Sequence, residues 1–457
     1  MFKPEVDSTL VKKEDSIKHV MRVIDRGGIG TAFVINEKSI LIGSVTDGDI
    51  RQAILKGADI NSKISSVMNV DPVFLYEDSL SRTHIVFEAV SKLLNRSEAN
   101  LYMPVVNKDK VLIKLILCSK LIKFEKGNSL KNSLPKSILI VGGAGYLGSI
   151  LCRKLIKAGY KVRVLDLLLF GKESLKELLS HPSFELVEGD MRNITTVVSA
   201  LKGINAVVNL AAIVGDPACQ KYPESAIETN YLANKLLAEA CKYHQINRFV
   251  YASTCSVYGI GNGKLDENSA LNPVSLYARS KIKSEEAILS LMDENFSPCI
   301  LRMSTLYGLS PRMRFDLVVN TMTMKAVTEG KITVFGGKQF RPLLHTSDAA
   351  DAYIKCLKAP IDKIKGQIFN VGSDDQNYRI SEIGKKVKSI VKDAELIINE
   401  DSSDPRDYLV SFKKINKQLG FATNVTIPFA VKEIKKTLDS GLIKDVKQPR
   451  YYNVGEN

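Results

Sequence analysis

Residues 137–166 read SILIVGGAGYLGSILCRKLIKAGYKVRVLD, and this stretch decides the fold of most of the chain. The apolar run Ile138–Val141 predicts a buried strand, and the amphipathic stretch after the glycines predicts a helix. A second apolar run, Val162–Leu165, ends at Asp166. A strand, a glycine-rich turn, a helix and a strand that ends in an acid together indicate a unit that binds a dinucleotide. We therefore expect an α/β fold built around this unit.

The glycines suit this task because of their spacing. Gly142, Gly145 and Gly148 stand three apart, where tight turning, close approach of a pyrophosphate and close helix packing each require glycine. The helix that follows offers free N–H groups and a positive dipole end to phosphates. Asp166 would accept hydrogen bonds from the adenosine ribose and repel a 2′-phosphate, which favours NAD over NADP. Asp190, in VEGDMRN, either meets the adenine or simply closes a turn after glycine.

Apolar strands continue to alternate with amphipathic helices beyond this unit. Such alternation predicts a Rossmann-type, doubly wound parallel sheet. The further strands expected are Phe184–Val187, Ala206–Leu210, Arg248–Tyr251 and Cys299–Leu301.

A tyrosine and a lysine follow at helical spacing. In YARSK, Tyr277 and Lys281 stand four apart, so a helix places both on one face. A tyrosine near its usual pKa of about 10 is a poor base at neutral pH. A neighbouring ammonium favours the phenolate, so we expect Lys281 to lower the pKa of Tyr277 and make it a general base.

With these motifs in place, about residues 137–440 resemble the extended short-chain dehydrogenase/reductase family, especially its nucleotide-sugar epimerases and dehydratases. The resemblance implies that Thr254 hydrogen-bonds the sugar hydroxyl that is oxidised, while Tyr277 takes its proton. Ser253 and Ser256 are expected to be scaffold. The cofactor contacts implied for NAD are Gly142, Gly145, Tyr146, Leu147, Gly148, Asp166, Asp190 and Lys281, the last of which also holds the nicotinamide ribose.

The same resemblance implies a grip on the substrate's diphosphate. Arg341 in FRPLLHTSD and Arg406 in DPRDY match the family's phosphate-binding arginines, and Asn320 matches its diphosphate-contacting asparagine. The planar fork of arginine pairs with two phosphate oxygens at once. Either arginine could instead form a surface ion pair.

Departures from the family pattern narrow the expected reaction. Dehydratases place an Asp-Glu pair after the threonine, whereas this chain has Cys255 and Ser256, and Thr305 stands where many 4-epimerases have asparagine. We therefore expect an NAD-dependent nucleotide-sugar epimerase that acts at C4 through a transient keto-sugar. The alternatives are a 4-dehydrogenase, reductase or dehydratase, and a non-catalytic scaffold that binds NAD and adenylates.

The N-terminal region has a different pattern. Short β–α units at Thr31–Ile35, Ile40–Val45 and beyond suggest an internal repeat of roughly 60 residues. The run LIGSVTDGDIRQAILKG resembles a CBS domain, which implies a CBS pair and a ribose contact for AMP, ADP or ATP at Thr46 and Asp49. The second copy has Leu117 and Lys120 at those positions, so one site is expected; a purely dimerising role is the alternative.

The expected organisation is a CBS pair at 1–125, a linker at 126–136 and the NAD-binding domain at 137–457, with a substrate subdomain mostly from about 306 onward. The net charge of +14 is spread along the chain, so we expect no nucleic-acid partner, although the charge can attract an anionic substrate. Seven scattered cysteines, no apolar run of membrane-spanning length and no apolar leader favour a cytoplasmic protein without a metal site. We also expect a homodimer.

Overall fold

The computed structural model describes residues 6–81, 85–86, 89–90, 93, 102–118, 134–399 and 406–454. The chain divides into two compact units, Met1–Ser133 and Leu134–Asn457. Most of the linker predicted at 126–136 lies outside the described residues, and so does Lys120.

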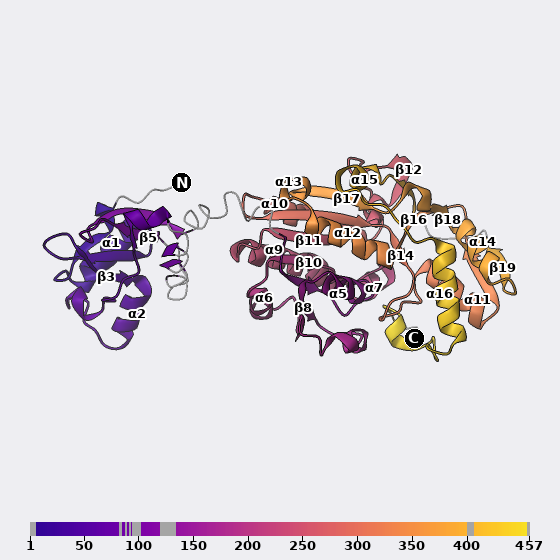
Figure 1. The fold of residues 1–457 in the computed structure, drawn as a ribbon, viewed down its shortest axis with the longest axis horizontal. Helices are drawn as coiled ribbons and strands as arrows, with labels where there is room; N and C mark the ends of the chain where they lie inside the picture. Colours follow the sequence, from indigo (N-terminus) through magenta and orange to yellow (C-terminus); the bar gives the residue numbers. More distant parts are fainter. Residues whose placement is uncertain are drawn as a thin grey trace. The chain divides into compact units, whose positions relative to one another are not determined.

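The larger unit is built on a seven-stranded parallel sheet (Figure 1). The strand order is β17-β13-β11-β10-β7-β8-β9. The chain adds β8 and β9 on one side of β7 and then crosses to add β10 on the other side, so the order of strands reverses between β7 and β10. Ligands of doubly wound sheets bind outside the carboxyl ends of the strands at such a reversal. The strands are β7 (Ser137–Val141), β8 (Lys161–Asp166), β9 (Phe184–Glu188), β10 (Ala206–Asn209), β11 (Arg248–Thr254), β13 (Ser297–Met303) and β17 (Gln367–Val371). The predicted strands are all present, and the fold class is confirmed.

Helices cover both faces of this sheet because successive strand residues point to opposite sides. Ile138 and Ile140 of β7 pack in one hydrophobic cluster, while Leu139 and Val141 pack in another. The first face carries α5 (Gly148–Lys157) and α12 (Thr346–Lys358). The second carries α6 (Ile194–Leu201), α9 (Ala233–Tyr243) and α10 (Leu276–Ser290). Shorter helices between these elements are η4 (Glu173–Leu178), α7 (Asp216–Lys221), α8 (Pro223–Ile227), η5 (Glu228–Leu232), η6 (Cys255–Tyr258) and α13 (Ile361–Ile364).

A second lobe of this unit has a core of its own, in which α11 (Val318–Thr328), α14 (Ile380–Ile390) and α16 (Ile427–Asp439) pack together. Its strands are β14 (Thr305–Tyr307), β16 (Phe340–His345), β18 (Asn377–Arg379), and the pair β15 (Lys331–Phe335) and β19 (Glu395–Asn399). The pair β12 (Ile260–Leu265) and β20 (Asp407–Val410), with η7 (Asp374–Gln376), α15 (Lys413–Leu419) and η8 (Pro449–Tyr451), completes the unit. The chain does not stay in this lobe after residue 306, because α12 and β17 return to the large sheet.

The smaller unit contains the same three-stranded arrangement twice. In each copy a short strand pairs parallel with a second strand, which pairs antiparallel with a third. The turns also correspond, because the side chains of Asn36 and Asn107 accept the same pair of backbone bonds. The repeat is therefore real but longer than roughly 60 residues. Its elements are η1 (Asp7–Thr9), β1 (Leu10–Lys12), α1 (Ile17–Gly27), β2 (Thr31–Ile35), β3 (Leu41–Thr46), α2 (Asp47–Leu55), η2 (Ile64–Ser66), β4 (Leu75–Tyr76), η3 (Glu77–Ser81), β5 (Tyr102–Val106) and β6 (Leu112–Leu117).

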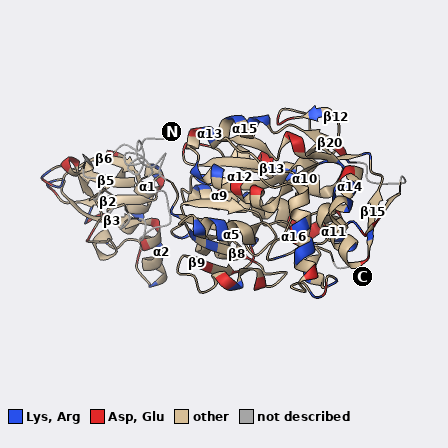
Figure 2. Cartoon of the chain, turned by 45° about the vertical axis from the view of Figure 1, so that its right-hand side comes forward, with Lys and Arg blue, Asp and Glu red and all other residues tan. Residues whose placement is uncertain are grey.

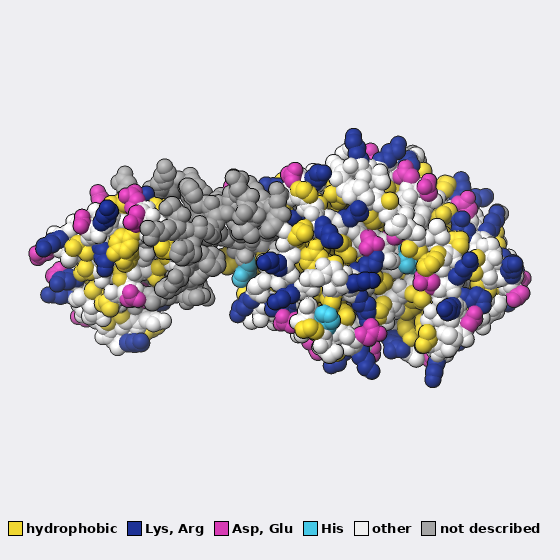
Figure 3. Space-filling model, viewed as in Figure 1, with side chains coloured by type: hydrophobic (Ala, Val, Ile, Leu, Met, Phe, Trp, Pro, Cys, Tyr) yellow, Lys and Arg dark blue, Asp and Glu magenta, His cyan; other side chains and the backbone are white. Residues whose placement is uncertain are grey.

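Positively and negatively charged side chains are intermixed on the surface. Figure 2 shows Lys and Arg on many helices of the larger unit with Asp and Glu among them, and the face seen in Figure 3 intermixes them with hydrophobic side chains. No helix in the part of the chain that the structure describes combines the length and apolar character needed to cross a bilayer.

Candidate active site

The glycine loop joins β7 to α5 at the carboxyl edge of the sheet. Gly142 has a φ of +84°, and a Cβ there would lie 2.7 Å from the backbone nitrogen of Ala211. A Cβ at Gly148 would lie 2.3 Å from the carbonyl oxygen of Gly142. Only glycine fits at either position, so the loop keeps its backbone open beside the N-terminus of α5. Gly145, Tyr146 and Leu147 form the turn between these two glycines.

Asp166 lies at the end of β8, next to this loop. One carboxylate oxygen accepts from the backbone N–H of Ala144 and the other from that of Leu168, both at 2.8 Å. Burial raises the pKa of this carboxyl, and the two backbone hydrogen bonds act against that shift. Each oxygen can accept a second hydrogen bond, so the carboxylate is fixed in place and can still bind ribose hydroxyls.

Asp190 lies past the end of the neighbouring strand, β9. Its carboxylate binds the guanidinium of Arg192 at 2.7 and 2.9 Å, and this hydrogen bonding lowers the pKa of the carboxyl. Arg192 also pairs with Glu228. The side chain of Asp190 is thus held by an ion pair, and an adenine contact stays a prediction.

Thr254, Tyr277 and Lys281 meet at the carboxyl edge of the same sheet. Thr254 ends β11, while Tyr277 and Lys281 lie one helical turn apart near the start of α10. The Thr254 side chain is near enough to Tyr277 to favour the ionised phenol, and its hydroxyl also donates to Ser256 at 3.1 Å. The Nζ of Lys281 donates to the carbonyl oxygen of Ala252 at 2.8 Å and lies 5.9 Å from the ring centroid of Tyr277. A hydroxyl, a phenol and an ammonium are therefore held within one small volume.

The ionisation of these groups differs from what their spacing suggests. Burial raises the pKa of Tyr277, and the positive charge of Arg314 and the neighbouring Thr254 side chain oppose this shift. We expected Lys281 to lower the pKa of this tyrosine. Burial instead lowers the pKa of Lys281 itself to about 8, against the attraction of Glu285.

A buried ion pair beneath these residues was not predicted. Glu285 lies one turn after Lys281 on α10 and binds Arg302 of β13 at 2.7 Å, with both side chains 4% exposed. Ser253, the neighbour of Thr254, donates to the same carboxylate, and its scaffold role stays a prediction. The sequence did contain a signal for Glu285, because it stands four residues after Lys281, which stands four after Tyr277, so a helix places all three on one face. The ion pair fixes α10 to β13, and the Ser253 hydrogen bond ties the same helix to the end of β11 that carries Thr254.

The two arginines predicted to bind diphosphate lie close to each other. Arg341 is 5% exposed, and its Nη1 donates to the carbonyl oxygen of Arg406. Arg406 forms an ion pair with Asp216 at 3.1 Å. Asp216 follows the end of β10 and its other carboxylate oxygen is buried without a hydrogen-bond partner. Arg341, Arg406 and Asp216 thus form one charged wall of the candidate site.

Asn320 is placed differently from expectation. It is fully buried, its Oδ1 accepts from the N–H of Gly308, and its Nδ2 donates to Tyr146 and to the carbonyl of Arg314, each at 2.9 Å. Because these bonds use its amide within the protein, Asn320 holds the 308–314 loop against the glycine loop. We therefore leave it out of the candidate diphosphate contacts.

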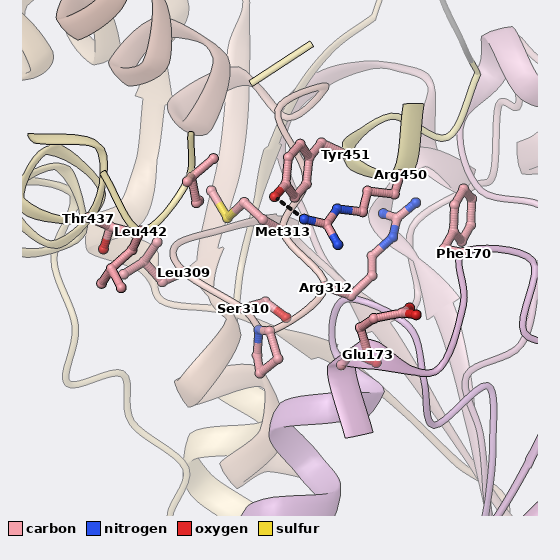
Figure 4. Close-up of a pocket in the computed structure, with 13 residues that line it drawn as sticks. Phe170, Glu173, Leu309, Ser310, Arg312, Met313, Thr437, Leu442, Arg450 and Tyr451 are labelled. Atoms are coloured by element: carbon pink, nitrogen blue, oxygen red, sulfur yellow. Dashed lines mark hydrogen bonds between the residues drawn. The ribbon is translucent and has the colours of Figure 1, made fainter. Parts of the chain in front are cut away.

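Beside the start of α5 is a cavity of about 460 Å³. Arg312, Arg450, Phe170 and Tyr451 are among its lining residues, and Figure 4 shows the two arginines extending into it from a loop and from the C-terminal tail. Neither arginine was predicted as a site residue, because nothing in the sequence places the tail beside the glycine loop.

In the smaller unit, Thr46 and Asp49 bind each other at the start of α2. The carboxylate of Asp49 accepts from both the N–H and the hydroxyl of Thr46 at 2.8 Å, while the Asp49 N–H donates to that hydroxyl at 3.2 Å. This reciprocal helix cap accounts for the presence of Thr46 and Asp49 without any ligand, although one carboxylate oxygen of Asp49 takes no part in the cap. Leu117 ends the corresponding strand β6.

Known proteins resemble both units. Residues 138–372 match the NAD dependent epimerase/dehydratase family, and residues 5–56 match the CBS domain. An uncharacterized UDP-glucose epimerase, YtcB, of Bacillus subtilis (strain 168) is 32% identical over 269 residues, which cover 56% of this chain and 81% of that protein. A UDP-glucose 4-epimerase of Lactobacillus helveticus is 28% identical over 275 residues, covering 55% and 82%.

Solved structures agree with this grouping. MoeE5 in complex with UDP-glucuronic acid and NAD superposes with a TM-score of 0.58 at 26% identity, covering 66% of this chain and 99% of that one. The UDP-glucuronic acid 4-epimerase of Bacillus cereus superposes with a TM-score of 0.60 at 24% identity, covering 66% and 99%, and shows the shared fold.

Proposed function

Because the chain belongs to the NAD-dependent epimerase/dehydratase family, we propose that it is a nucleotide-sugar epimerase that inverts C4 through a transient keto-sugar. The chain is an NAD-dependent enzyme, and NAD, when bound, supplies the acceptor for the hydride that leaves C4. The observation that carries the proposal is the cluster of Thr254, Tyr277 and Lys281 beside the glycine loop.

The residues present fit this cofactor. The open backbone at Gly142 and Gly148 leaves room for a pyrophosphate at the start of α5, and the fixed carboxylate of Asp166 faces the expected ribose position. Lys281 would hold the nicotinamide ribose from the other side of the groove. A carboxylate here disfavours a 2′-phosphate by like charge.

Each catalytic side chain has a distinct task in the proposed reaction. Thr254 holds the sugar 4-hydroxyl by a hydrogen bond, and Tyr277 accepts the proton of that hydroxyl as C4 is oxidised. Lys281 keeps a positive charge near the developing phenolate, which stabilises it. After the keto-sugar rotates in the site, the hydride returns to the opposite face of C4 and Tyr277 returns the proton to the 4-oxygen, so no net cofactor is consumed.

Elimination of water is less well supported than epimerisation. A 4,6-dehydratase needs an acid and a base next to the threonine, yet Cys255 donates from a buried site to the carbonyl of Arg302, and Ser256 accepts from Thr254. The remaining rival is a dehydrogenase or reductase that releases its product after one hydride transfer.

The substrate grip that we propose uses the arginine wall. Arg341 and Arg406 would bind the diphosphate of the nucleotide sugar, since their guanidiniums match phosphate oxygens in pairs. UDP-linked sugars are the first candidates, because a UDP-glucose 4-epimerase is among the relatives.

One experiment separates these reactions. The purified protein is incubated with UDP-, GDP-, CDP- and dTDP-linked sugars, the products are read by NMR, and the absorbance at 340 nm is followed. An epimer formed without net NADH supports the proposal. A keto-sugar accompanied by stoichiometric NADH assigns a dehydrogenase, and no conversion of any sugar refutes a catalytic role on these substrates.

For the smaller unit we propose one adenine-nucleotide site per chain, at Thr46 and Asp49. The free oxygen of Asp49 and the Thr46 hydroxyl lie side by side, because the other Asp49 oxygen accepts from that hydroxyl at 2.8 Å, and this arrangement suits two adjacent ribose hydroxyls. Binding can alter turnover only if the nucleotide favours one of two states of the enzyme.

A further inference from the structure

The C-terminal tail, residues 449–454, lies over the loop that carries Arg312. We propose that this tail belongs to the cofactor site: Asn453 holds Arg312 so that its guanidinium binds the pyrophosphate of NAD. The inference rests on the proposed binding of NAD at the glycine loop.

The loop with Arg312 is fixed against the start of α5. The hydroxyl of Ser310 donates to the carbonyl oxygen of Tyr146 at 2.6 Å, and it lies 3.1 Å from the hydroxyl of Ser149. Tyr146 belongs to the glycine loop, and Ser149 to the first turn of α5. Arg312 is therefore brought beside the helix end where phosphates are expected.

The other neighbour of Arg312 is Phe170. The guanidinium carbon lies 3.7 Å from the ring centroid, and Phe170 follows β8 in the segment just after Asp166. The arginine therefore spans from the glycine loop to the segment that borders the adenosine ribose. A pyrophosphate bound at the start of α5 would pass between these two segments.

The guanidinium of Arg312 is buried, and its N–H groups have few hydrogen-bond partners. The residue is 6% exposed, its Nε has no hydrogen-bond partner, and its Nη2 donates to Asn453 at 2.9 Å. Within the described ranges it forms no ion pair with a carboxylate, although Glu173 lines the same cavity. Burial, reinforced by Arg314, lowers the pKa of Arg312 to about 10. A buried cation without a counter-ion is costly, and a phosphate would relieve that cost.

Asn453 ties this loop to the edge of the large sheet. Its Nδ2 donates to the carbonyl of Val214, in the loop after β10, at 3.2 Å, and its N–H donates to Asp316 at 3.3 Å. The tail is anchored by Tyr451, which is 7% exposed and accepts from the N–H of Phe315 at 2.9 Å. The tail thus joins the loop after β10 to the loop that carries Arg312.

Arg450 adds a second positive group to the cavity. Its Nη2 donates to the hydroxyl of Tyr451 at 2.9 Å, and Figure 4 shows its guanidinium near that of Arg312. Two guanidiniums that converge on one cavity favour an anionic ligand, and the phosphates of a dinucleotide have the required charge and position.

The test measures NADH binding by the full chain, through NADH fluorescence, without any turnover. Arg312→Gln should raise the Kd for NADH by at least about tenfold, and Asn453→Ala by about two- to tenfold, because each loses hydrogen bonds to a charged group. Competition with adenosine and with ADP-ribose provides the second readout: Arg312→Gln should weaken ADP-ribose and leave adenosine, which has no phosphate, unchanged. Lys447→Gln, which removes an exposed charge just before the tail and outside this cavity, is the control and should match wild type.

Five outcomes overturn the inference. If Arg312→Gln leaves the NADH affinity unchanged, or weakens the binding of adenosine and of ADP-ribose equally, Arg312 does not contact the phosphates. Weakened UDP binding with unchanged NADH binding assigns the guanidinium to the substrate, and wild-type affinity in Asn453→Ala removes the tail. A wild-type chain that binds NADH but converts no sugar refutes only the proposed epimerase, whereas one that binds no NADH refutes both.

Discussion

Replacing Lys281 with Met should stabilise the larger unit at pH 7 while it abolishes turnover. The ammonium is 2% exposed, and burial lowers its pKa from 10.5 to about 8. At about 1.4 kcal/mol for each unit of pKa, this shift corresponds to about 3 kcal/mol of destabilisation when the lysine is charged. Loss of the hydrogen bond to Ala252 and of the contact with the Tyr251 ring, 4.7 Å away, subtracts about 1–2 kcal/mol. We expect a net gain of about 1–2 kcal/mol.

The pH dependence of the free energy of unfolding tests the direction of this prediction. The pKa of Lys281 is lower in the folded than in the unfolded state, so between pH 8 and 10.5 the unfolded chain binds more protons. Wild-type stability should therefore rise with pH over this range, as the charge is lost. The advantage of Lys281→Met should be complete below about pH 8 and fade as the pH approaches 10.5.

The assay is urea unfolding of cofactor-free protein, followed by far-UV circular dichroism at pH 7 and at pH 10. Lys283→Met on the same helix is the matched control, because Lys283 is 63% exposed and should give no pH-dependent gain. A variant less stable than wild type at pH 7, or an advantage that grows with pH, would refute the reasoning.

Other substitutions test the remaining groups. Tyr277→Phe should lower kcat by about 10²–10⁴-fold and leave NADH affinity within twofold, because only the proton acceptor is lost; a variant that keeps a third of the wild-type rate would exclude Tyr277 as the base. Glu285→Gln should lower the free energy of unfolding by about 3–5 kcal/mol, because Arg302 is left buried without its counter-charge. The double variant Glu285→Leu/Arg302→Met should recover most of that loss, and equal losses in both would contradict the ion-pair argument. Asp166→Ser should narrow the preference for NAD over NADP in binding titrations, and an unchanged ratio would mean that the ribose is recognised elsewhere. Asp49→Ala should abolish the heat of AMP, ADP or ATP binding to the full chain, and retained heat would place that site elsewhere.

The sequence alone determined the features that depend on local spacing. The glycine triplet, the strands around it and the Tyr277–Lys281 spacing each follow from short-range periodicity, and the structure has the strand, turn and helix where they were expected. Thr254 was located by the family resemblance, and the structure places it at the end of β11, where the carboxyl ends of the parallel strands meet at one edge. The repeat in the smaller unit was also visible, because its two hairpins share the same pattern of apolar residues and turns.

What the tertiary structure decided is how distant segments satisfy one another's polar groups. Asn320 looked available for a ligand, but the preceding 308–314 loop and Tyr146, which is far from it in sequence, use its amide. The cation that opposes the raised pKa of Tyr277 is Arg314. Burial sets the direction of that shift, and the spacing of residues in the sequence does not reveal burial. Arg312 and Asn453 come together only because the tail folds back over the glycine loop. Hydrogen-bond partners and desolvation depend on which segments pack together, and that information is spread over the whole chain instead of any one motif.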